Sequence, residues 1–212
     1  MTGRPNPGRR AELLEQILDY LETHALNSIS MRKLAQALGV STFTLTYQFN
    51  SQEELMAAIR TAVNERLLTL GELLNSTPGS RFAYAESCRR FWNSASSKQY
   101  AAYLRLEMES SIQQSLEPEA RIPALQARAA WRLASTAALV SLGVPPSAAT
   151  VEAEVNQATV FGLLHAAISS PRVDFAAAFE YALAAHVERI AELAEPRARA
   201  GRVSSGLGRA AE

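Results

Sequence analysis

Between residues 29 and 55 the chain carries a pattern that fits two short helices joined by a glycine turn. Ser30 is a favourable N-cap, and the apolar residues after it recur at spacings of three and four, as on one face of a helix. Gly39 then supplies the left-handed or otherwise tight backbone that ends this helix. Ser41 caps a second helix, which we expect over residues 42–48. Together these features predict a helix-turn-helix.

The second helix of this motif has an apolar face that can pack against a core and a second face whose polar and aromatic side chains can contact a partner. Leu45 and Phe49 lie four residues apart and are expected to hold the helix against the core. Its other positions carry small polar and aromatic side chains: Thr42, Phe43, Thr44, Thr46, Tyr47 and Gln48. A short helix with such side chains can enter the major groove of DNA. Thr42 and Thr44 are then candidates for bonds to base edges, and Phe43 for contact with a thymine methyl group.

Residues 39–49, GVSTFTLTYQF, resemble the turn and second helix of the TetR family of one-component bacterial repressors. That family typically has Gly-Val-Ser, two variable residues, Thr-Leu-Tyr and an aromatic end with phenylalanine. The chain departs from this pattern at Thr46, where tyrosine is common, and at Gln48, where histidine is common. It also has Gln52 where a lysine usually contacts a phosphate, which puts one backbone contact in doubt.

The resemblance implies an all-α protein with an N-terminal three-helix helix-turn-helix domain and a C-terminal helical domain for ligand binding and dimerisation. It implies a repressor that binds a palindromic operator in double-stranded DNA as a homodimer and is released by a small-molecule effector. The sign of the effect, repression or activation, is not encoded in the motif. By family likeness Tyr47 and Gln48 contact phosphates, as do the amides at the helix starts at Met31 and Gln52. The expected DNA-contacting residues are Ser30, Arg32, Ser41, Thr42, Phe43, Thr44, Thr46, Tyr47, Gln48 and Gln52.

The overall charge of the chain gives no general attraction to nucleic acid. Lys and Arg number 21, Asp and Glu also number 21, and the isoelectric point is near 6.9. DNA binding therefore has to come from local clusters of cations. Two candidate clusters are Arg4, Arg9 and Arg10 near the N-terminus, and Arg32 with Lys33 at the start of the first motif helix. Ordinary solvated charges are the alternative interpretation of both.

Cysteine content and hydropathy indicate a cytoplasmic protein. The single cysteine, Cys88, excludes an intrachain disulfide and is expected to be a small packed residue. The first eight residues are polar and do not form the apolar region of a signal peptide. The most apolar stretch, residues 129–144, contains Arg132 and is too short to cross a bilayer. We expect no membrane partner.

Helical periodicity runs through nearly the whole chain, and no segment alternates with period two for long. We expect a first helix over residues 8–24 within a helix-turn-helix domain at 1–50. Ser51 and Glu54 form a capping-box pattern that opens a long linking helix over 51–75. A ligand-binding and dimerisation domain follows at 76–196, with helices near 80–97, 99–116, 118–142, 147–169 and 174–195. The tail at 197–212, rich in arginine, glycine and serine, is expected to be disordered.

The last two long helices are apolar around most of their circumference, for example in the stretch ATVFGLLHAAI at 158–168. Such a helix has to be covered on more than one side. A two-fold partner would supply the cover by forming a four-helix interface, which is also what the resemblance implies. An entirely intramolecular core is the alternative.

Large amphipathic side chains in the C-terminal part are candidates for an effector pocket, which needs apolar walls with a few polar anchors. They are Phe91, Trp92, Tyr103, Glu107, Met108, Trp131, Gln157, Phe161 and His165. Each aromatic residue can instead be an ordinary core residue. Glu107 lies close to an apolar face, where its carboxylate can hold a cationic or hydroxylated ligand or simply lie at a solvated edge.

The sequence offers no sign of catalysis, a metal or a cofactor. The three histidines are isolated, without His-Glu-x-x-His or Cys-x-x-Cys spacing. Neither a Gly-x-Ser-x-Gly elbow nor a phosphate-binding Gly-Lys-Ser/Thr loop is present. We therefore expect no enzyme. A second alternative is a helical module that binds a ligand or a protein and whose DNA binding is weak or lost, as the substitutions at Thr46 and Gln52 would allow.

Overall fold

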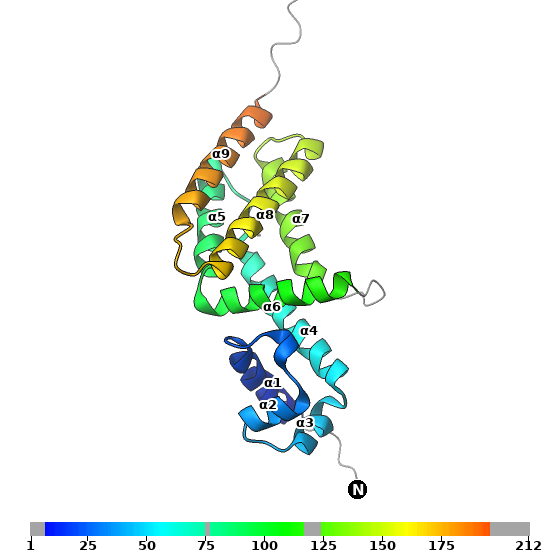
Figure 1. The fold of residues 1–212 in the computed structure, drawn as a ribbon. Coiled ribbons are helices and arrows are strands. Elements are labelled where there is room, and N and C mark those ends of the chain that lie inside the picture. Colours follow the sequence, from blue (N-terminus) through cyan, green and yellow to red (C-terminus); the bar gives the residue numbers. More distant parts are fainter. Residues whose placement is uncertain (1–6, 75–76, 117–123, 196–212) are drawn as a thin grey trace, which may run out of the picture.

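The computed structural model describes residues 7–74, 77–116 and 124–195. Within these residues the chain forms nine α-helices and two short 3₁₀ helices, and no strand. This confirms the predicted all-α class. Three helices pack together at one end of the molecule, and we call them the head: α1 (Pro7–Leu21), α2 (Met31–Ala37) and α3 (Thr42–Phe49) (Figure 1). The long helix α4 (Gln52–Gly71) leads from the head into the remaining helices.

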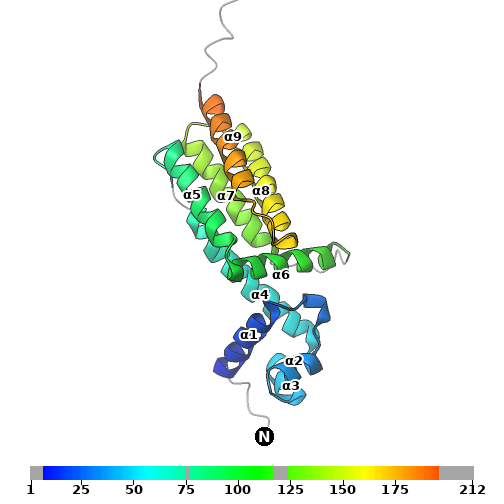
Figure 2. The same ribbon diagram turned by 60° about the vertical axis from the view of Figure 1, so that its left-hand side comes forward.

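Those remaining helices form the body of the molecule. They are α5 (Arg81–Ala95), α6 (Lys98–Ser115), α7 (Ala124–Ser141), α8 (Pro146–Ser169) and α9 (Ala176–Ala194). In both views α6 lies across the end of the body that faces the head, and α8 and α9 run side by side (Figures 1 and 2). The predicted breaks near Ser96, Gly143 and Ser170 are confirmed, and Gly143 adopts a positive φ of 92° that ends α7.

Two predicted helix ends differ from the structure. The first helix ends at Leu21 and does not reach His24. There the His24 ring stacks on Tyr20 and its Nδ1 bonds the Tyr20 carbonyl at 2.8 Å, so a side chain takes the place of the next helical amide. The linking helix tightens into a 3₁₀ turn at Glu72–Leu74. Arg4, the predicted helix start near 118 and the tail at 197–212 lie outside the described residues.

Hydroxyl caps open the helices of the head where the sequence predicts them. The Oγ atoms of Ser30, Ser41 and Ser51 each accept a hydrogen bond from the amide three residues later, at 3.3, 3.0 and 3.2 Å. Each cap contributes about 1 kcal/mol to helix stability. Gly39 between the two motif helices has φ of 66°, a conformation that strains residues with a Cβ. The turn geometry is therefore set by local sequence.

A fully buried apolar core fixes the orientation of α3. Leu45 and Phe49 of α3 are 0% exposed, and they pack with Leu13, Ile17 and Leu34 from the other two helices of the head. Because the buried positions of α3 face this core, its remaining positions are held toward solvent.

The long helix α4 is tied to α7 by two buried polar contacts. Trp131 Nε1 donates to the carbonyl of Leu67 at 3.1 Å, and the amide of Ala127 donates to Asn64 Oδ1 at 3.2 Å. A Cβ at Gly71 would lie 2.0 Å from Trp131 Nε1. The indole can therefore lie against α4 only because residue 71 has no side chain.

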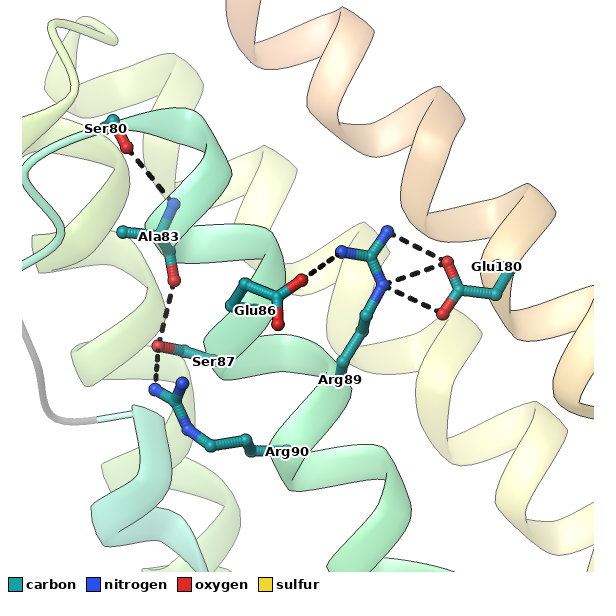
Figure 3. A network of polar contacts seen from close by, with 7 residues as sticks. All are labelled: Ser80, Ala83, Glu86, Ser87, Arg89, Arg90 and Glu180. Atoms are coloured by element: carbon teal, nitrogen blue, oxygen red, sulfur yellow. Dashed lines mark hydrogen bonds and ion pairs between the residues drawn. The ribbon is translucent and has the colours of Figure 1, made fainter.

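A charged network joins α5 to α9 on the surface of the body (Figure 3). Arg89 forms a forked contact with Glu180, with Nε–Oε1 at 2.9 Å and Nη2–Oε2 at 3.0 Å, and also pairs with Glu86. The same view shows Ser80 capping α5 through the amide of Ala83. Two-point arginine–carboxylate contacts restrict orientation, so this exposed network adds to the buried contacts between α5 and α9, such as the stacking of Trp92 on Phe179. No helix among the described residues has the length and hydropathy needed to cross a membrane.

Candidate nucleic-acid interface and effector cavity

The outer face of α3 is a compact set of small hydroxyl groups around one large aromatic ring. Thr42, Phe43 and Thr46 are exposed, and Phe43 has 77% of its surface open to solvent. The half-buried Tyr47 ring stacks on Phe43 with a centroid separation of 6.2 Å. Thr42 and Thr46 lie one helical turn apart and share a face with each other. This face is free of the core and presents an apolar centre with hydroxyl flanks.

Two of the residues predicted to contact DNA are directed elsewhere in the structure. Thr44 is half-buried, and its Oγ1 lies 2.8 Å from the Oγ of the cap residue Ser41. Gln48 is only 7% exposed, because it lies on the side of α3 that carries Leu45 and Phe49. Its amide is therefore turned toward the core, and the predicted phosphate contact would need a change of rotamer.

Cations flank the motif on two sides. Arg32 and Lys33 are exposed at the start of α2, and Lys33 Nζ donates to the carbonyl of Ser28 at 2.8 Å. At the start of α1, Arg9 pairs with Glu12 at 2.6 Å, so part of its charge is already neutralised. Arg10 lies over the Phe49 ring at 5.1 Å and donates to the carbonyl of Gln48. Among the described residues of the head, the positive charge that faces outward beside α3 is therefore concentrated on α2.

The first turn of α4, which borders the outer face of α3, carries no positively charged side chain. Gln52 is exposed at the first position of α4, and two acidic residues, Glu53 and Glu54, follow it. Backbone hydrogen bonding at the helix start, assisted by Ser51, lowers the pKa of Glu53 below its usual value. The negative charges of both side chains interact favourably with the positive end of the α4 helix dipole, but they repel an approaching phosphate. The start of α4 thus offers amide groups and no positive side chain.

A cavity of about 30 Å³ lies in the body between α5, α7, α8 and α9. Its walls are aromatic: Trp131 stacks on Phe161 at 5.3 Å and meets Phe91 edge-on at 5.2 Å. Four of the residues predicted for the effector pocket line it: Phe91, Trp131, Gln157 and Phe161. Seven further lining residues were not predicted: Leu74, Cys88, Ser135, Asn156, Val160, Phe179 and Leu183. No lining residue carries a formal charge.

The other five predicted pocket residues do not line this cavity. Glu107 is 3% exposed, and it is paired with Arg128 at 2.5 Å and accepts from Ser111 at 3.0 Å. Its carboxylate is therefore already paired with a cation of the protein. The remaining four are Trp92, which stacks on Phe179; Tyr103, which lies against Arg66; Met108, which is half-buried on α6; and His165, which is exposed on α8.

Trp92 instead borders a wider groove of about 460 Å³ between the end of α5, the start of α6 and the end of α8. Ile168 and Phe175 contribute apolar surface to this groove. An ion pair between Lys98 and Glu22, at 3.3 Å, lies at its edge. The groove is wide and open to solvent, whereas the aromatic cavity is much smaller and only partly enclosed.

A buried chain of hydrogen-bonded side chains, which we call the relay, lies next to the aromatic cavity and consists of Tyr84, His186 and Glu152. His186 Nδ1 lies 2.7 Å from Glu152 Oε1, and His186 Nε2 lies 3.0 Å from the hydroxyl of Tyr84. A carboxylate can only accept, so Nδ1 donates to Glu152 and, in the neutral ring, Nε2 accepts from Tyr84. Burial lowers the pKa of His186 and outweighs the opposing effect of Glu152, which favours this neutral form.

The relay reaches the cavity wall through Cys88. Burial raises the pKa of Tyr84 well above its usual value, and the adjacent Cys88 adds to this effect. Burial likewise raises the pKa of Cys88 to about 11, so the thiol keeps its proton, as expected for a packed residue. In the sequence the one sign of this relay is His186 within an apolar helix, because its partners are 34 and 102 residues distant along the chain.

The arrangement of a three-helix head on a helical body matches solved structures of transcriptional regulators. A transcriptional regulator from Rhodococcus sp. Rha1 superposes with a TM-score of 0.65 at 21% sequence identity, covering 87% of this chain and 95% of that protein. A TetR transcriptional regulator from Legionella pneumophila superposes with a TM-score of 0.61 at 19% identity, covering 88% of this chain and 96% of that protein. No protein-family model matches the chain, and no curated protein does.

These matches define the class of fold. The chain is an all-α protein with a helix-turn-helix head and a helical C-terminal body. More particularly, its fold is that of TetR-type transcriptional regulators, as the GVSTFTLTYQF segment predicts.

Proposed function

We propose that the protein is a transcriptional repressor that binds a palindromic operator as a homodimer. The outer face of α3 is the observation that carries this proposal. It is an exposed, short helix held rigidly by Leu45 and Phe49, and its polar and aromatic side chains have no role in the core. Arg32 and Lys33 stand beside it, where phosphates flank the major groove.

Two copies of the head are needed to read two half-sites one helical turn apart, at roughly 34–36 Å. A stripe on α8 supports pairing through the last two helices. Exposed small and apolar residues recur along it at spacings of three and four: Val151, Val155, Ala158 and Gly162. On α9, Tyr181 is 82% exposed. An apolar face of this length on adjacent helices is typical of a four-helix dimer interface.

The aromatic cavity is the proposed effector site. Since its walls carry no formal charge, the effector is a neutral, largely apolar compound with groups that bond Ser135, Asn156 or Gln157. Pockets for drug-sized ligands measure roughly 300–1,000 Å³, at least about ten times the space present, so binding has to separate the stacked rings of Trp131 and Phe161. Because Trp131 is bonded to α4, that separation displaces the helix that carries the head.

A gel shift on the DNA that flanks the gene of this protein tests the proposal. We expect binding whose logarithm falls linearly with the logarithm of salt concentration, with a smaller slope for Arg32→Ala. The matched control is Arg132→Ala, which removes an exposed arginine from α7, outside the head. Absence of binding at low salt would instead support the alternative of a ligand- or protein-binding module, which the uncharged Gln52 favours.

A further inference from the structure

Phe43 is exposed to an extent that the folding of the head does not explain. Among the described residues 7–74 it is the one large apolar side chain on the surface. The apolar residues that form the core of this region, among them Leu13 and Leu55, are at most 6% exposed. Because an exposed phenyl ring adds nothing to the core, its place at the second position of α3 leaves the ring available to contact a base once this helix enters the major groove.

The exposed side chains of α3 also lack the groups that read guanine and adenine by paired hydrogen bonds. Guanine is read mainly by arginine or lysine, and adenine by asparagine or glutamine. α3 contains neither cation, and Gln48, its one amide side chain, is buried. What remains outward is the ring of Phe43 and the hydroxyl and methyl groups of Thr42 and Thr46.

In the major groove the apolar feature that such a surface can recognise is the 5-methyl group of thymine. We infer that α3 selects its half-site chiefly by thymine methyl groups, with the Phe43 ring as the main contact and the methyl groups of Thr42 and Thr46 beside it. The inference rests on the proposed DNA binding and specifies its chemistry. The half-site positions that face α3 are T·A or A·T pairs, and Tyr47 supports the Phe43 ring by stacking.

Replacing thymine with deoxyuridine removes the methyl group alone and leaves base pairing intact. The test begins with selection of bound sites from random duplex DNA by the full-length protein. The selected site is then resynthesised with one thymine at a time replaced by deoxyuridine, and dissociation constants are measured at fixed salt. We expect one or two positions in each half-site where the replacement weakens binding about fourfold, as for the loss of one buried methyl group. Replacing cytosine with 5-methylcytosine at a T→C variant of such a position should restore binding.

Variants of Phe43 test whether this side chain causes the sensitivity to deoxyuridine. In Phe43→Ala the sensitive position should become insensitive to deoxyuridine, with affinity for the thymine site already reduced. Phe43→Leu, which keeps an apolar side chain, should retain part of the sensitivity. Phe82→Ala is the matched control, because Phe82 on α5 is 74% exposed but lies in the body. Since Phe43 is exposed, thermal melting should show the variants fully folded.

The outcomes separate this inference from the proposed function. Tight binding that no deoxyuridine replacement weakens, or equal sensitivity in Phe43→Ala and the parent, would overturn methyl recognition while DNA binding stands. Selected sites with guanine at the positions facing α3 would do the same. Failure to select any site, with no retardation at low salt, would overturn both.

Discussion

At the scale of single residues, the missing side chain at Gly71 decides how α4 and the body fit together. The indole of Trp131 occupies the space that a Cβ at residue 71 would need. Its buried Nε1 also finds an acceptor in the carbonyl of Leu67, and without that acceptor the indole N–H would be buried and unpaired. One glycine therefore permits both a close approach and a buried hydrogen bond.

Gly71→Ala should destabilise the protein by about 2–3 kcal/mol, because the rigid indole has to move and the buried bond to Leu67 is strained or lost. Chemical denaturation measures the loss. Gly79→Ala is the control, since no atom lies within 4 Å of the added methyl group. Equal stability of the two variants would show that the indole moves at no cost.

The relay of Tyr84, His186 and Glu152 links stability to pH. The pKa of His186 is lower in the folded protein than its ordinary value of 6.5, so the unfolded chain binds more protons as the pH falls below 6.5. The free energy of unfolding therefore decreases with falling pH, from about pH 6.5 down to the folded pKa of His186.

His186→Gln should flatten this dependence, because the amide keeps a donor for Glu152 and an acceptor for Tyr84 but does not titrate. Denaturation at a series of pH values between about 5 and 8 measures the change. His165→Gln, a substitution of the exposed histidine on α8, should keep the dependence of the parent protein. A parent protein more stable at about pH 5 than at about pH 8 would contradict the expected direction.

At the scale of helices, α6 holds the end of α1 through two charged side chains. Arg105 donates to the carbonyls of Leu21 and His24, and Glu109 accepts from the amide of Leu26 at 2.6 Å. The same helix carries Glu107, which is paired with Arg128 of α7. α6 is thus bonded to the head through one set of side chains and to the body through another.

Glu109→Ala should loosen the end of α1 without unfolding the body, because the amide of Leu26 loses its charged acceptor. Such a bond is worth about 1.5 kcal/mol or more, so amide hydrogen exchange at Leu26 should accelerate about tenfold. Glu154→Ala, which removes an exposed ion pair with Arg132, is the control and should leave that exchange unchanged. Unchanged exchange in Glu109→Ala would mean that the 3₁₀ turn, and not α6, protects this amide.

At the scale of the whole molecule, the proposed dimer places the exposed stripe of α8 against a second copy. Val155→Glu would introduce a charge twice into such a symmetric interface. The dimer dissociation constant, measured by sedimentation, should rise at least about 100-fold. Val173→Glu is the matched control, because Val173 is 53% exposed and Val155 is 55% exposed. Val173 lies in the loop before α9 and outside the proposed interface, so this variant should keep the dissociation constant of the parent protein. Equal self-association of both variants would place the interface elsewhere.

Local sequence determined the elements of this protein. Helical periodicity, the caps at Ser30, Ser41 and Ser51 and the turn at Gly39 each depend on residues within about four positions, and the structure has them where the sequence predicts them. The head was predictable to this degree because a cap or a turn needs no distant partner.

Only the tertiary structure decided what the buried polar groups do. Glu107 is a pocket candidate by its spacing, but the packing of α6 on α7 brings Arg128 to it. Gln48 belongs to the outer face by its residue type, but the rotation of α3 about Leu45 and Phe49 turns it inward. The partner of a buried charge or amide depends on which helices meet and at what rotation, and that is fixed by the burial of the whole apolar core rather than by any short stretch of chain.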